Sequence, residues 1–152
     1  GAQPTVVRIS SSCSLNMPNM ALSASLAVVS DGQIVLGNQA SFSSSNATPP
    51  ELMFIIPSTD SCSSITAPSI YATNNLSFSG VDFLLFTPCD IQMKNGFTSS
   101  NGAAGQLYAG GNLNPGNNLS FNFAPVLVPG AGQVTGYSVN TAYLREIANG
   151  SS

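Results

Sequence analysis

The sequence contains no histidine, and its three cysteines lack the spacing of a metal-binding motif. Without histidine the chain cannot build a Ser-His-Asp or Cys-His nucleophile, a histidine-ligated zinc site or the usual general base near neutral pH. It also has no GxxxxGK[ST] motif and no GxGxxG motif between a strand and a helix, so nothing predicts a nucleotide site. We therefore expect no metal, no cofactor and none of the common enzyme mechanisms.

Charged residues are almost as scarce, with 3 Lys and Arg against 6 Asp and Glu. The three basic residues, Arg8, Lys94 and Arg145, cannot follow a phosphate backbone, which excludes nucleic-acid binding. No apolar run approaches the ~20 residues of a membrane span. Because 43% of the residues are hydrophobic, we expect one folded domain over residues 1–152 with a neutral, hydroxylated surface, secreted or displayed on a cell.

A pair of carboxylates is the one catalytic arrangement that the composition still permits. The candidates are Glu51, Asp60, Asp82, Asp90 and Glu146. Glycoside hydrolysis uses such a pair, but the chain has no tryptophan to form a sugar platform. Four tyrosines substitute for it only in part: Tyr71, Tyr108, Tyr137 and Tyr143. We predict that the protein is not an enzyme and rank a small glycan-active enzyme third among its functions.

Hydrophobic residues recur with a period of two, which is typical of β-strands. The runs are 24–30, 33–43, 51–57, 68–80, 81–86, 90–97, 117–123 and 136–147, with a weaker one at 5–10. Turn residues separate them, and this spacing predicts an all-β, antiparallel β-sandwich of the jelly-roll or immunoglobulin-like kind. A strand from a neighbouring subunit could complete one of its sheets.

Three segments carry more specific expectations. The continuously apolar runs 51–57 and 81–86 predict central strands covered on both faces. The Gly- and Asn-rich segment 98–116 predicts a long flexible loop. Residues 141–149 fit either a last strand or a short terminal helix.

The string NNLSF occurs twice, at 74–78 and 117–121. A shift of 43 residues matches little else, and we find no period of 20–50 residues that would indicate a solenoid or propeller. Both copies hold an Asn-x-Ser sequon, and the four candidate glycosylation sites are Asn46, Asn75, Asn118 and Asn149. A chain this rich in Asn, Ser and Thr contains several sequons by chance, so the number is not evidence of glycosylation.

The number of cysteines is odd, so they cannot all pair within one chain: Cys13, Cys62 and Cys89. Cys62 and Cys89 bracket two expected strands, and a disulfide between them would stabilise the fold by about 3 kcal/mol. Cys13 is then a free thiol or pairs with another molecule. Two alternatives are open: Cys13 forms a disulfide with Cys62 or Cys89, or all three cysteines are buried free thiols.

Three functions are weighed. The first is a secreted or cell-surface structural protein, an adhesive or filament-forming subunit that pairs with copies of itself by exchanging a terminal strand, 5–10 or 136–147. Those runs fit equally well as ordinary first and last strands of a closed sandwich. The second is a soluble extracellular module that binds carbohydrate, including host or surface glycans, or a small apolar ligand through 98–116 and Tyr108. The third is the carboxylate enzyme above.

Overall fold

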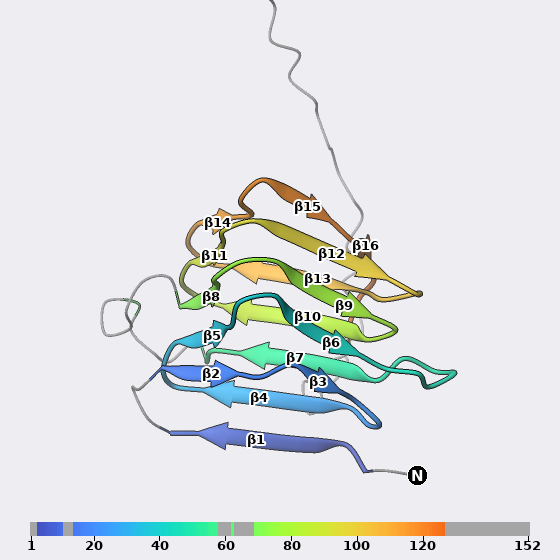
Figure 1. Ribbon diagram of the computed structural model, residues 1–152. Coiled ribbons are helices and arrows are strands. Elements are labelled where there is room, and N and C mark those ends of the chain that lie inside the picture. The colour runs from blue at the N-terminus through green and yellow to red at the C-terminus, as the bar shows by residue number, and fades with distance from the viewer. Residues whose placement is uncertain (1–2, 11–13, 58–61, 63–68, 127–152) are drawn as a thin grey trace, which may run out of the picture.

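The computed structural model describes residues 3–10, 14–57, 62 and 69–126. In this part of the chain the backbone winds into a stack of about five turns, a β-solenoid, in which each turn places one strand in each of three sheets (Figure 1). All the strand pairs recorded in these residues are parallel, as in Thr5↔Leu26, Leu15↔Ile34 and Met20↔Phe42. The expected antiparallel β-sandwich is therefore wrong, although the all-β prediction holds.

The strands of the three sheets alternate along the chain. Sheet A contains β1 (Thr5–Ile9), β4 (Leu26–Ser30), β7 (Glu51–Ile55), β10 (Asp82–Thr87), β13 (Ala104–Ala109) and β16 (Asn122–Phe123). Sheet B contains β2 (Leu15–Met17), β5 (Ile34–Leu36), β8 (Ile70–Ala72), β11 (Ile91–Met93) and β14 (Leu113–Asn114). Sheet C contains β3 (Met20–Ala21), β6 (Ala40–Ser43), β9 (Leu76–Ser79), β12 (Gly96–Ser100) and β15 (Asn118–Ser120).

The period-two pattern explains how these strands form the core. Alternate residues of each strand point inward, and the in-register stacking places them in columns, each column holding the residues at one register position in successive turns. In sheet B one such column is Ile34, Ile70 and Ile91, all fully buried. Inside the stack the phenylalanine rings pack on one another with centroids 4.3–5.6 Å apart: Phe42, Phe54, Phe78, Phe83, Phe97 and Phe121.

The two NNLSF strings lie two turns apart in the same column. Leu76 pairs with Phe97, which pairs with Leu119, so the intervals of 21 and 22 residues add up to the 43-residue shift. The expectation that the sequence has no solenoid period is thus wrong. The middle turn reads NGFTSS instead of NNLSFS, which keeps the buried apolar residue at the Leu76 position but hides the repeat.

Hydrogen bonds between successive turns hold the corners. Between sheets B and C an asparagine ladder forms, in which Asn95 donates to Asn74 and Asn74 Nδ2 donates to Asn38 Oδ1 at 2.6 Å. Beside this ladder, Asn75 Oδ1 accepts from the backbone N–H of Gly96 at 3.0 Å. The ladder links the corners of three successive turns through side-chain hydrogen bonds.

Two of the local expectations have opposite outcomes. β7 and β10 are central in sheet A and are buried on both faces. Their outer face is covered by a cluster that includes Met53, Leu84 and Val126. The prediction of central, doubly covered strands is confirmed. Segment 98–116, by contrast, is not a long loop, because it contains the end of β12, all of β13 and β14. Its glycines fit the stack: a Cβ on Gly105 would lie 2.1 Å from the Phe83 carbonyl oxygen.

Within the described residues, no helix is long and apolar enough to cross a membrane. The segments 136–147 and 141–149 lie outside these residues. Segment 5–10 forms the first strand of sheet A, paired with β4.

Candidate functional site

The two ends of the described stack expose the core columns. At the first end Val7 shares a column with the buried Val28, yet 41% of its surface is exposed. At the other end Phe123 shares a column with Gly105 and is 73% exposed. Solenoids ordinarily cover such ends with an atypical, polar turn. Neither described end has one.

The last strands of sheets B and C repeat this geometry. Leu113 pairs with Ile91, and Leu119 pairs with Phe97. Both partners are completely buried, whereas Leu113 and Leu119 are about two-fifths exposed. An apolar patch from all three sheets therefore faces solvent at this end. An open hollow of about 590 Å³ adjoins it, with Asp90, Ile91, Gln92, Asn112, Leu113, Asn114 and Pro115 in its wall.

Within the described chain, the strand edges at the two ends also lack partner strands. In the described part of the chain β1 pairs with β4 alone, so one side of Thr5–Ile9 carries no strand. Among the described strands, β16 pairs with residues 104–105 of β13 and no strand pairs with residues 106–109 on that side. Exposed parallel edges of this kind can pair with another chain.

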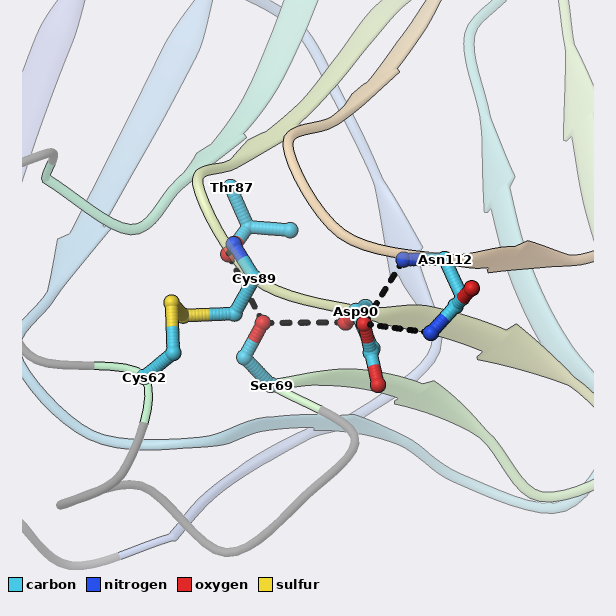
Figure 2. Close-up of a disulfide and its surroundings, with 6 residues drawn as sticks. All are labelled: Cys62, Ser69, Thr87, Cys89, Asp90 and Asn112. Atoms are coloured by element: carbon cyan, nitrogen blue, oxygen red, sulfur yellow. Dashed lines mark hydrogen bonds between the residues drawn. A yellow bond between two sulfur atoms is a disulfide. The ribbon is translucent and has the colours of Figure 1, made fainter.

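A disulfide lies on the side of the stack, away from these ends. It joins Cys62, in the long connection between β7 and β8, to Cys89 at the corner after β10 (Figure 2). This is the pairing expected from the sequence. Cys13 lies outside the described residues.

A buried hydroxyl pair supports that corner. Ser69 Oγ lies 2.7 Å from Thr87 Oγ1 and donates to the Asp90 carbonyl at 2.9 Å, while Thr87 Oγ1 accepts from the Cys89 N–H (Figure 2). The Asp90 carboxylate accepts from the backbone N–H of Asn112 in the next turn at 2.7 Å. These contacts link successive turns, which gives Asp90 a structural role.

The candidate carboxylates are brought together only in part. Glu51 and Asp82 are register partners on β7 and β10, and Asp82 accepts a hydrogen bond from the Ala104 N–H at 3.1 Å. Asp90 belongs to another corner, and Asp60 and Glu146 lie outside the described residues. Within the described chain, no three His, Cys, Asp or Glu side chains are grouped as metal ligands.

The Glu51 and Asp82 pair has a consequence for stability. Burial, and next the neighbouring Asp82 carboxylate, raise the pKa of Glu51 above its usual value of 4.5. The folded protein then binds this proton more tightly than the unfolded chain does. The contribution of Glu51 to the free energy of unfolding therefore falls as pH rises from 4.5 through the raised pKa.

We predict that Glu51→Gln removes this decline and makes the protein more stable at neutral pH. The amide keeps the shape of the side chain but carries no charge near Asp82. Urea unfolding of both proteins at a series of pH values from about 4 to 7 measures the effect. Equal pH slopes for the two proteins would show that Glu51 does not titrate in this way.

The sequons and tyrosines occupy separate surfaces. Asn46, Asn75 and Asn118 are all exposed, and Asn149 lies outside the described residues. Asn46 Nδ2 donates to the Ser23 carbonyl at 3.0 Å, whereas Asn75 takes part through Oδ1, which accepts from the Gly96 N–H. Tyr108 stacks on Phe86 on the outer face of sheet A, with ring centroids 4.9 Å apart. Tyr71 is on sheet B, where Lys94 Nζ lies 5.7 Å from its ring centroid. Tyr137 and Tyr143 also lie outside.

The open ends could not be found from the sequence, because they are defined by columns of residues that cross several turns. The available signal was the Asn-led corner followed by alternating apolar and hydroxyl residues, at 38, 74, 95 and 117. Comparisons with known protein families, curated proteins and solved structures found no significant match.

Proposed function

We propose that the protein is a secreted or cell-surface structural subunit that assembles end to end with copies of itself. The observation that carries the proposal is the pair of open ends, where core columns and strand edges of the described chain meet solvent. Ends of this kind bury apolar surface and pair backbone groups when another stack is placed on them.

The two ends are complementary because every turn has the same three-sided section. All strands of sheet A run in one direction, so β1 of one copy can follow the last strand of another without reversing polarity. A contact between two different surfaces of identical subunits builds a ring if its rotation closes and a filament if it does not. Stacking one copy on the end of another displaces each copy along the solenoid axis, so the expected product is a filament. This assembly adds strands at an edge, and no terminal strand has to leave its own sheet.

Charge and redox state agree with this function. Arg8 and Asp31 are the charged groups beside β1, and they already pair with each other at 3.3 Å. β14, β15 and β16 contain no charged residue, so the charges that ordinarily keep strand edges apart are missing there. The Cys62–Cys89 disulfide is compatible with an oxidising, extracellular location.

Negative-stain electron microscopy and sedimentation of the full 152-residue chain test the proposal. We expect fibres one solenoid wide whose amount rises steeply with protein concentration. Val7→Lys should raise the concentration needed for assembly by at least about tenfold, since an unpaired buried ammonium costs several kcal/mol and each 1.4 kcal/mol is tenfold.

Val35→Lys is the matched control, because it places the same charge on the outer face of β5, on the side of the stack. It should assemble like the parent chain. A monodisperse small particle at all concentrations would overturn the proposal, and equal loss of assembly in both variants would show that charge acts nonspecifically. Glycan-binding screens would then test the second candidate, a carbohydrate-binding module, which the exposed aromatic stack of Tyr108 on Phe86 favours.

A further inference from the structure

Sheet C presents a regular array of hydroxyl groups on its outer face. The inward residues of its strands, such as Phe42, Leu76 and Phe97, are fully buried in the core. The residues between them therefore point outward. They form two columns, which together we call the hydroxyl face: Ser41, Ser77, Thr98 and Ser120 in the first, and Ser43, Ser79 and Ser100 in the second.

The spacing of this array follows from the strands. Parallel neighbours lie about 4.8 Å apart, and two residues along a strand span about 6.6 Å. Hydroxyls 4.8 Å apart are too distant to bond each other directly, since that needs about 2.5–3.0 Å. One water molecule fits between each neighbouring pair, so the face can hold water in rows with the period of the sheet.

The face is regular and uncharged. Strands β6, β9, β12 and β15 lie one above another in nearly the same direction (Figure 1). Packed phenylalanine rings support these strands from inside. The ring centroid of Phe78 lies 5.4 Å from that of Phe42 and 5.5 Å from that of Phe97. None of the five strands of sheet C contains a charged residue. The described strands of this sheet therefore present no strongly hydrated charged side chain to the solvent.

The other two sheets of the described chain lack such an array. The outer face of sheet A is largely apolar, with Met53, Leu84 and Phe86. The outer column of sheet B is mixed: Asn16, Val35, Tyr71, Gln92 and Asn114. The hydroxyl order is therefore a property of one face and does not simply follow from a serine-rich composition.

We propose that the hydroxyl face binds the surface of crystalline water, that is, ice. The strand spacing is close to the short lattice repeat of hexagonal ice, so waters held between hydroxyls lie near lattice positions. Liquid water must lose entropy to occupy such rows, whereas the surface of ice is already ordered. A crystalline polysaccharide fits this face less well. Sugars stack on aromatic rings, and the two tyrosines in the described part of the chain, Tyr71 and Tyr108, lie on other sheets.

Incorporation of the fluorescently labelled full chain into a slowly growing ice shell tests this binding. The parent chain should enter the ice, and it should also shape ice crystals in a thermal-hysteresis measurement. Ser77→Tyr and Thr98→Tyr place a bulky neutral ring in the array without touching the core. Each should lower the incorporated fraction at least tenfold.

Val35→Tyr is the control, because it adds the same ring to the outer face of sheet B. It should enter ice like the parent chain, and circular dichroism should show that all three variants fold. Exclusion of the parent chain from ice, or full incorporation of Ser77→Tyr and Thr98→Tyr, would overturn the inference. Binding to cellulose or chitin but not to ice would overturn it too. None of these substitutions is at an open end, so failure here leaves end-to-end assembly unaffected.

Discussion

Replacing Phe78 by alanine should lower the free energy of unfolding by about 3–5 kcal/mol. The Phe78 ring has no exposed surface, and its centroid lies 4.3 Å from that of Phe83 and 5.4 Å from that of Phe42. Truncation would leave a cavity at the centre of the stack, where turns above and below prevent collapse. Urea unfolding monitored by circular dichroism measures the loss.

Phe123→Ala is the matched control, since it removes the same ring from an exposed position. Its effect on the dilute, unassembled protein should stay within about 0.5 kcal/mol. Similar losses for the two variants would mean that the phenylalanine stack is not the main source of stability.

Removing the Cys62–Cys89 disulfide should cost about 3–4 kcal/mol, the chain-entropy value for a closed loop of 27 residues. The comparison is between the oxidised parent chain and the double variant Cys62→Ser, Cys89→Ala, in which alanine suits the buried site of Cys89. The reason is that the long connection between β7 and β8 gains freedom in the unfolded state when the bridge is absent.

Reductant supplies the control for this second prediction. It should destabilise the parent chain to nearly the level of the double variant and leave the double variant unchanged. If reductant weakens both proteins equally, the stabilisation comes from another source.

Local structure was predictable from the sequence where it depends on near neighbours. The period of two located most described strands, and the apolar runs 51–57 and 81–86 identified the doubly covered strands β7 and β10. Parallel pairing was not predictable in this way, because an inward-outward alternation is the same in parallel and antiparallel sheets. What distinguishes them is which strand lies next to which.

That information was obscured by two long connections. Ile70 pairs with Ile91 after 21 residues, but Ile34 pairs with Ile70 only after 36. The extra residues fall at 44–50 and 57–69, the latter bearing the disulfide. A fixed-period comparison therefore aligns the turns on either side out of register. The two NNLSF strings survived because both lie beyond these connections.

The candidate surfaces could not be predicted from the sequence for the same reason. Each turn contributes only one or two hydroxyls to the face of sheet C, as Ser77 and Ser79 do in β9. Within a single segment such serines resemble any solvent-facing strand residues. Their order emerges only when the turns are stacked.

The stacking of turns also determines how this molecule can vary in size. Each strand pairs with strands one turn before or after it, so most contacts join residues about 21 or 22 apart in the regular part of the stack. An insertion or deletion of one complete turn would leave every remaining column continuous, whereas a change of a few residues inside a strand would break three sheets at once. Descendants of this chain should accordingly differ in length by whole turns or within the two long connections, and seldom anywhere else.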